Sequence, residues 1–119
     1  MIVYRFKISE NGLTREEFDM KRDDNLYVCD IGEVSSACVE NSMVLYDSMY
    51  SLCDDIEIAK MRFDCDIHRR LHKLEKIAIR AFENNNDVSY DKVNDLINQN
   101  KALLDHLEKS DREREEMEW

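Results

Sequence analysis

Apolar residues in the C-terminal half recur in steps of three and four, the spacing of one buried helix face. The first series runs through Ile56, Ala59, Phe63, Ile67, Leu71, Leu74, Ile77, Ala78, Ala81 and Phe82. After the polar segment 83–87, the second runs through Val93, Leu96, Ile97, Leu103, Leu104 and Leu107. Two helices of similar length joined by a short polar loop lie antiparallel. The spacing therefore predicts a helical hairpin over residues 54–108.

Short polar residues mark the expected starts of both helices. Asp54 is the expected N-cap of the first helix, and Asp87 or Ser89 that of the second, because their side chains can accept a hydrogen bond from a free backbone N–H. The segment 109–119 is highly charged and follows the end of the apolar series. It is expected to continue as a solvated helix or to fray.

The N-terminal part alternates with a period of two, which is typical of half-buried strands. The apolar positions of the first strand are Ile2, Tyr4, Phe6 and Ile8. The dipeptide Asn11-Gly12 then predicts a hairpin turn, followed by a charged return strand over 13–20. After a polar turn at 21–25, residues 26–31 are the best candidate for a third strand of one antiparallel meander.

Residues 33–53 fit two interpretations. An alternating series indicates a strand, with Val44, Tyr46, Tyr50 and Leu52 on one side, whereas a three-four series indicates a helix through Val39, Met43, Tyr46 and Tyr50. We prefer the strand. The predicted fold is then α+β in a single domain over 1–119, with a small antiparallel β-sheet (1–53), a long antiparallel helical hairpin (54–108) and a charged tail (109–119).

Composition narrows the function classes. The chain of 119 residues has no proline, two glycines and a formal net charge of −10, so a general nucleic-acid binder is not expected, since phosphate contact needs clustered Lys and Arg. Arg5 and Lys7 interrupt the apolar start, and no run of about eighteen apolar residues occurs, which predicts a cytoplasmic protein without a membrane partner. The four cysteines are expected to be reduced thiols.

The residues for chemistry are sparse. Cys65, His68 and His72 have a spacing that can hold a metal ion, but they fall on the outer face of the first helix and lack a fourth ligand, so no metal site is expected. Two glycines are too few for a phosphate-binding loop, and no nucleophile motif is present. We therefore expect neither an enzyme nor a cofactor.

Acidic residues are the first candidates for a binding surface. One group, from the predicted sheet, is Glu16, Glu17, Asp19, Asp23 and Asp24, and the other, from the tail, is Asp111, Glu113, Glu115, Glu116 and Glu118. Their carboxylates could engage a basic groove of a partner in place of nucleic acid, with Tyr46, Tyr50 and Trp119 as aromatic anchors. The alternative is that the charges only solvate the surface and the aromatic rings pack in the core.

Asn100 interrupts an apolar line in the second helix. The line is Val93, Leu96, Asn100, Leu103 and Leu107, and a single amide in such a seam can fix the register of a helical assembly. The sequence therefore predicts a possible homodimer. The alternative is an Asn100 at the edge of the stripe that bonds the neighbouring helix or water.

The order of elements resembles small proteins encoded by phages and mobile elements of Gram-positive bacteria. The resemblance lies in the opening 1–8, the Asn-Gly turn, the charged return strand and the helix start at 54–60. It implies a non-enzymatic inhibitor, in the host cytosol, that occupies a basic surface of a host defence protein such as a CRISPR nuclease. Two other functions stay open: a self-associating helical bundle, or a binder of a small ligand or signal nucleotide at an oligomer interface.

Overall fold

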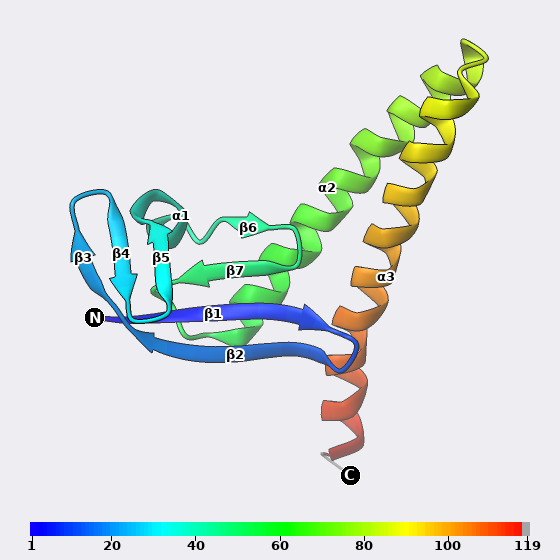
Figure 1. Ribbon diagram of the computed structural model, residues 1–119. Coiled ribbons are helices and arrows are strands. Elements are labelled where there is room, and N and C mark those ends of the chain that lie inside the picture. The colour runs from blue at the N-terminus through cyan, green and yellow to red at the C-terminus, as the bar shows by residue number, and fades with distance from the viewer. Residues whose placement is uncertain (118–119) are drawn as a thin grey trace.

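The chain folds into two antiparallel sheets followed by a long helical hairpin (Figure 1), so the predicted α+β class is confirmed. The computed structural model describes residues 1–117, with side chains described for residues 1–109. The elements, in chain order, are β1 (Ile2–Ser9), β2 (Gly12–Asp19), β3 (Lys21–Asp23), β4 (Leu26–Cys29), β5 (Gly32–Ser35), α1 (Ser36–Glu40), β6 (Val44–Leu45), β7 (Ser48–Ser51), α2 (Ile56–Glu83) and α3 (Asp87–Met117).

The first sheet has the strand order β2-β1-β7-β6 and contains the predicted N-terminal hairpin. Gly12 lies at the turn with φ of 104°, a conformation that side chains disfavour. Tyr4, Phe6 and Ile8 face the helices as the alternation predicts. The opposite face is also covered, because Val3 is fully buried against the second sheet. The sheet therefore has two apolar faces at its N-terminal end, where the sequence predicts one.

The predicted single meander is wrong, because β3, β4 and β5 form a separate three-stranded sheet. The polar segment 21–25 was expected to be a turn, yet Lys21–Asp23 pairs with β4 and keeps its three side chains exposed. The turn is reduced to two residues, with Asp24 at φ of 55°. Tyr27 from β4 packs with Met20, Val39 and Val3 in a small second core. This core, which alternation alone did not predict, separates the two sheets.

Residues 33–53 contain both a helix and strands. The preferred single strand is corrected to two short strands, Val44–Leu45 and Ser48–Ser51, which form a hairpin on the edge of the first sheet. The short helix α1 precedes it and buries Val39. Tyr46 sits in the hairpin turn with φ of 61°, so the expected alternation through Tyr46 is broken there.

The helical hairpin is confirmed, but its N-caps differ from those predicted. Asp55, not Asp54, caps α2, and its Oδ1 accepts a hydrogen bond from the Glu57 N–H at 2.9 Å. At the start of α3, Asn86 Oδ1 accepts from the Ser89 N–H at 3.2 Å. In each case the N-cap lies one residue from a predicted position. A neighbouring Asp or Asn can accept the same backbone hydrogen bond, so sequence alone does not choose between them.

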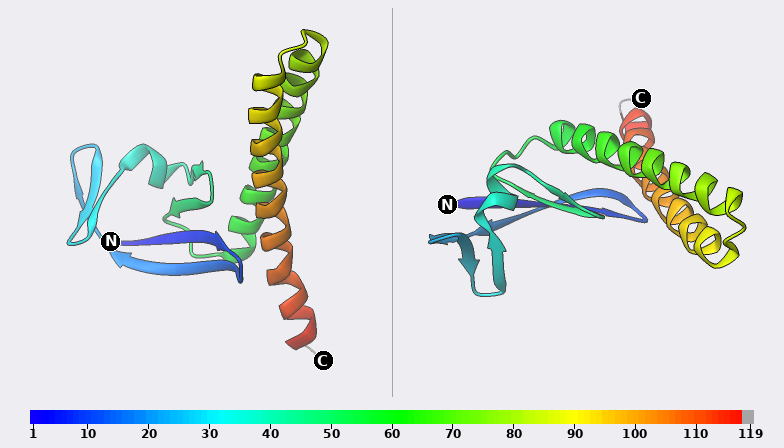
Figure 2. Two further views of the ribbon diagram at one scale, coloured as in Figure 1. Left: turned by 45° about the vertical axis from the view of Figure 1, so that its right-hand side comes forward. Right: turned by 90° about the horizontal axis from the view of Figure 1, so that it is seen from above.

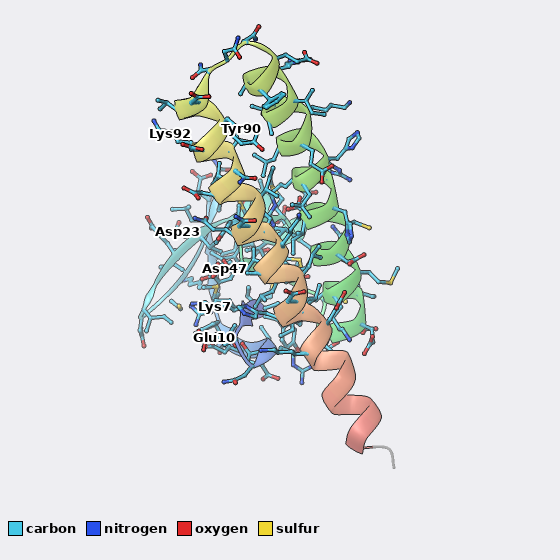
Figure 3. All side chains as sticks on the ribbon, turned by 90° about the vertical axis from the view of Figure 1, so that its right-hand side faces the viewer. Lys7, Glu10, Asp23, Asp47, Tyr90 and Lys92 are labelled. Carbon is cyan, nitrogen blue, oxygen red and sulfur yellow. The ribbon has the colours of Figure 1, made fainter. Side chains whose placement is uncertain are left out.

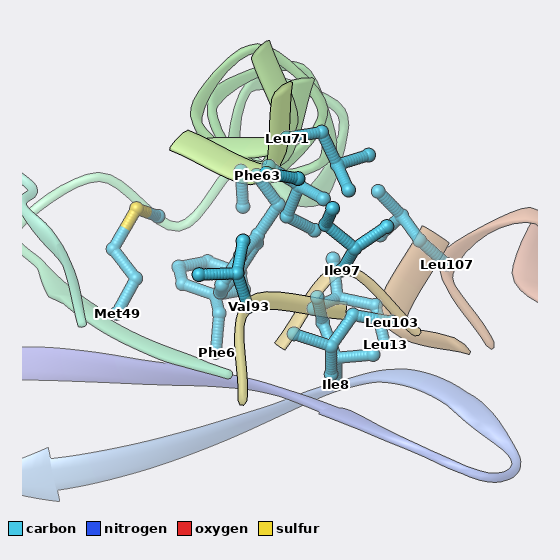
Figure 4. Close-up of a cluster of buried hydrophobic side chains, with 13 residues drawn as sticks. Phe6, Ile8, Leu13, Met49, Phe63, Leu71, Val93, Ile97, Leu103 and Leu107 are labelled. Atoms are coloured by element: carbon cyan, nitrogen blue, oxygen red, sulfur yellow. The ribbon is translucent and has the colours of Figure 1, made fainter. Parts of the chain in front are cut away.

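The main core lies where the inner half of the hairpin crosses the first sheet (Figure 4). Phe63 and Ile67 of α2 are fully buried there with Phe6 of β1. Ile8 and Leu13, next to the β1–β2 turn, pack in the same cluster as Leu103 of α3. Burial of this size supplies most of the favourable free energy of folding.

The half of the hairpin next to the α2–α3 loop, about residues 70–99, extends past the sheet (Figures 1 and 2). We call it the outer half. The molecule measures 52 × 47 × 20 Å. In Figure 3, Tyr90 and Lys92 lie near the upper end of the hairpin, far from Lys7 and Glu10 at the level of the β1–β2 hairpin. In the part of the chain that the structure describes, no helix combines the length and the apolar character needed to cross a membrane.

Candidate protein-binding surface

The outer half of the α2–α3 hairpin exposes large apolar side chains. Ala78 and Ala81 fill the contact between the two helices, and both are buried. Larger residues near them lie off this narrow stripe and face outward. The exposed fractions are 46% for Ile77, 58% for Ile79, 72% for Phe82, 67% for Val88 and 43% for Leu96. Ile77 and Ile79 are two residues apart, so they flank the buried stripe on opposite sides of α2. Large exposed apolar side chains at one end of a molecule are typical of an interaction surface. We call these five residues the apolar tip.

An aromatic pair joins the two helices at this end. The ring centroids of Phe82 and Tyr90 are 6.1 Å apart and the planes are inclined by 54°, a tilted arrangement that aromatic pairs favour. Phe82 lies in the last turn of α2 and Tyr90 in the first turns of α3. The pair therefore places two aromatic rings together beside the loop 84–86.

The edge of the sheet reaches the hairpin through Tyr46. The Tyr46 hydroxyl donates to Gln99 Oε1 at 3.4 Å, and the Arg70 guanidinium carbon lies 5.6 Å from the centroid of the Tyr46 ring. Tyr46, a predicted partner anchor, thus contacts the hairpin of its own chain. Tyr50 packs against the second core, and Trp119 lies outside the described residues.

A row of basic side chains follows the outer face of α2. It consists of Arg69, Lys73, Lys76 and Arg80, which are all exposed and follow one another in steps of four, three and four. This spacing puts them on one helix face, opposite the buried Ile67, Ala78 and Leu71. Among the described residues, no ion pair involves these four side chains. We call these four residues the basic row. It is a local positive feature on a chain whose net charge is −10.

A groove lies at the inner end of the basic row. It has a volume of about 580 Å³ and runs between α2 and the connection from α1 to β6. Met43, Ile58 and Met61 line it with apolar surface, Arg62 and Arg69 line it with positive charge, and Asp66, which pairs with Arg70, adds one carboxylate. Arg62 Nη1 donates to the Asn41 carbonyl at 3.2 Å, so this side chain holds the two walls together.

The predicted acidic residues are not gathered on one surface. Glu16 and Glu17 are neighbours on β2 and so face opposite sides of the sheet. Glu16 pairs with Arg5 at 2.6 Å and Asp19 with the N-terminal amine at 3.0 Å. The hydrogen bond that the Arg5 guanidinium donates to Glu16, and next the hydrogen bond with Tyr50, raise the pKa of Arg5. The carboxylates of Glu16 and Asp19 therefore already have partners within the chain.

The remaining acidic candidates lie elsewhere. Asp23 and Asp24 are exposed at the β3–β4 turn, on a different sheet from Glu16 and Glu17. The candidates in the tail, Glu115 and Glu116 with Asp111, Glu113 and Glu118, fall outside the residues whose side chains are described. Association of this protein with a basic surface therefore stays a prediction.

The predicted seam in α3 faces the inside of the chain. Four of its residues are buried in the monomer, namely Val93, Asn100, Leu103 and Leu107. Only Leu96 is exposed, at 43%. Asn100 Nδ2 donates to the Leu96 carbonyl at 2.8 Å, the local bond that the alternative interpretation describes. The apolar line is thus used to fold α3 onto α2 and the first sheet, and self-association stays a prediction that needs another surface.

Cys65, His68 and His72 are exposed on α2. His68 Nδ1 lies 2.8 Å from the Asp64 carbonyl oxygen, so one ring nitrogen is engaged by the helix itself. Within the described part of the chain, no group of three or more His, Cys, Asp or Glu side chains is arranged to hold a metal ion. The cysteines Cys29, Cys38, Cys53 and Cys65 are free thiols.

Comparison of the chain with protein-family models, with curated proteins and with solved structures gave no match.

Proposed function

We propose that this protein is a binding module, not an enzyme, and that it docks onto a partner protein through the outer half of its helical hairpin. The observation that supports this most is the apolar tip, where two rigid helices hold exposed apolar residues beyond the rest of the fold. The Phe82 ring, 72% exposed and paired with Tyr90, is suited to enter a pocket of the partner.

The inhibitor function implied by the resemblance is one form of this proposal. An inhibitor and an adaptor both need a rigid surface that keeps its shape on binding. The backbone N–H and carbonyl groups in the middle of each helix are bonded within that helix, so the hairpin needs no partner to keep its shape. The identity of the partner is a separate question.

The experiment compares the full chain with a tip variant in which Phe82→Ser and Val88→Ser are combined. The tagged chain captures partners from a lysate of cells that produce it, and the captured proteins are quantified. The matched control is Ile31→Ser, because Ile31 is 74% exposed and lies in the β4–β5 turn. We expect the tip variant to lose its partner and the control to keep it.

Both variants should melt like the wild type, since surface substitutions usually change stability by less than about 0.5 kcal/mol. A tip variant that keeps the same partners at full yield would contradict the proposal. Sedimentation of the purified protein covers the self-association alternative: a dimer lost only in the tip variant would make the partner a second copy.

A further inference from the structure

We infer that the partner presents a short acidic segment with an apolar anchor, and that this segment lies along the outer face of α2, with its carboxylates on the basic row and its anchor in the groove. This inference rests on the proposed function and assigns a chemistry to the bound partner. It reverses the charge expected from the sequence, because the contacting surface of this acidic protein is basic.

The basic row is a concentrated positive feature. Residues 1–55 contain 12 acidic and 5 basic residues, whereas residues 68–80 contain five Lys and Arg and one Glu. Two acidic residues flank the row. Asp66 is already paired, since its Oδ2 lies 3.0 Å from Arg70 Nε, and Glu83 is exposed three residues after Arg80. The four side chains of the row are therefore left to attract carboxylates from outside.

The groove supplies an apolar site next to the row. Met43 and Ile58 are each 45% exposed, and Met61 is 68% exposed. Methionine side chains adapt to varied apolar partners, so this groove can accept a leucine or an aromatic side chain. Arg62 and Arg69 at its rim would hold a neighbouring carboxylate in place.

The dimensions fit a short peptide. From Ile58 in the groove to Arg80 at the end of the row, the helix rises about 33 Å, at about 1.5 Å per residue. An extended chain of about ten residues covers the same length. One short segment can thus reach the groove and the whole row together.

A protein segment fits better than a nucleic acid for two reasons. The groove offers aliphatic and methionine side chains to a Leu, but among the described residues its lining has no aromatic ring on which a base could stack. The acidic remainder of the chain, with a net charge of −10 overall, also repels a long polyanion that extends past the row.

The test uses the full chain and a fluorescent synthetic peptide of about ten residues in which a single Leu lies near one end and Glu and Asp fill the remaining positions. We expect saturable binding that weakens about tenfold between about 50 and about 300 mM salt. A second peptide, with Gln and Asn in place of the acids, should not bind. A third, with Ser in place of Leu, should bind about tenfold more weakly.

Two variants of the protein locate the binding. Combining Lys73→Glu with Lys76→Glu should reduce affinity for the acidic peptide at least about tenfold. The matched control combines Lys92→Glu with Lys101→Glu, the same charge change at two exposed lysines of α3, and should change affinity less than about threefold. Met61→Ser should lower the affinity for the Leu peptide to that for the Ser peptide.

Two results would overturn the inference. One is an acidic peptide that does not bind, or that binds the Lys73 and Lys76 double variant as well as the wild type. The other is tighter binding of single-stranded DNA of matched length, lost in that same variant, which would assign the basic row to nucleic acid. Neither result contradicts the proposed function. If a partner is captured through the apolar tip and the Lys73 and Lys76 double variant still binds it, docking through the tip is supported and the acidic segment is ruled out.

Discussion

Arg70 of α2 holds Tyr46 of the β6–β7 turn by two different contacts. Its guanidinium carbon lies 5.6 Å from the Tyr46 ring centroid, and its Nη2 donates to the Tyr46 carbonyl at 2.9 Å. Tyr46 has φ of 61°, a left-handed conformation that is unfavourable for a residue with a bulky side chain. The contacts to Arg70 offset this backbone cost, and they connect the sheet to the hairpin at the point where its outer half begins.

The first prediction concerns this connection. Arg70→Met keeps the apolar stem and should lower the free energy of unfolding by about 1–2 kcal/mol, because it removes one cation–π contact, one hydrogen bond and the ion pair with Asp66. Arg70→Lys should recover less than half of the loss, because an ammonium lacks the planar fork. Urea denaturation measures both. In a Tyr46→Gly background, which removes the ring and relieves the backbone, the cost of Arg70→Met should shrink; an unchanged cost would show that Arg70 acts elsewhere.

A second prediction contrasts two phenylalanines of the same helix. Phe63 is fully buried between α2 and the first sheet, so Phe63→Ala should cost about 3–5 kcal/mol by leaving a cavity. Phe82→Ala should cost less than about 0.5 kcal/mol, since its ring is 72% exposed. Leu74→Ala and Leu104→Ala, at partly buried positions beside the core, should lie between them at about 2 kcal/mol. Thermal melting that ranked Phe82 with Phe63 would mean that the outer end is covered.

The third prediction is a pH dependence at Lys60. Burial lowers the pKa of Lys60 below that of an exposed lysine, so the unfolded chain binds more protons just below the ordinary lysine pKa of about 10.4. The stability contribution of Lys60 therefore rises as pH increases through that alkaline window. Lys60 Nζ lies 4.0 Å from Glu57 Oε2, but the lowered pKa shows that burial outweighs such contacts, so Lys60→Met should be more stable than the wild type at neutral pH.

The difference in the free energy of unfolding between Lys60→Met and the wild type should become smaller as the pH approaches about 10.4. Guanidinium denaturation of both proteins at a series of pH values measures it. Lys76→Met, at an exposed position of the same helix, is the control and should show a difference that does not depend on pH. A constant difference for Lys60→Met would mean that the ammonium reaches water.

The elements that the sequence predicted correctly are those whose pattern lies within the element itself. The helical hairpin and the β1–β2 hairpin have strong periodicity and a turn signal, and both are confirmed. Strand β3 consists of Lys21, Arg22 and Asp23 with no apolar position, so pairing with β4 is a tertiary effect that no pattern could show. Val3 is buried for the same reason: it is covered by a second sheet whose position depends on distant residues.

The candidate surface was missed for a different reason. The basic row is present in the sequence at helical spacing. The net charge of −10, however, favoured the carboxylates as the predicted binding groups. Local charge on one helix face, not the total, decides which partner surface is complementary. The exposure of Phe82 could not be predicted either. Its position in the sequence fits the apolar series of the helix, but in the structure the buried stripe ends at Ala81.

The last prediction concerns Asn100, which is 3% exposed in the core of its own chain. Its Nδ2 bonds the Leu96 carbonyl, but among the described residues no donor reaches its buried Oδ1. A buried polar atom without a partner costs about 1–3 kcal/mol, so Asn100→Leu, which keeps the number of side-chain heavy atoms and their branching, should raise the free energy of unfolding by about 1 kcal/mol. Asn94→Leu, at an exposed position of the same helix, is the control and should have little effect.

Sedimentation of both variants separates the two interpretations of Asn100. Within the intramolecular core, Asn100→Leu should leave the mass of the particle unchanged while raising the melting temperature. A residue that sets the register between chains would behave differently, since its replacement by Leu alters the number of subunits or makes it heterogeneous. A change of stoichiometry in Asn100→Leu but not in Asn94→Leu would therefore return Asn100 to the seam between chains that the apolar line first predicted.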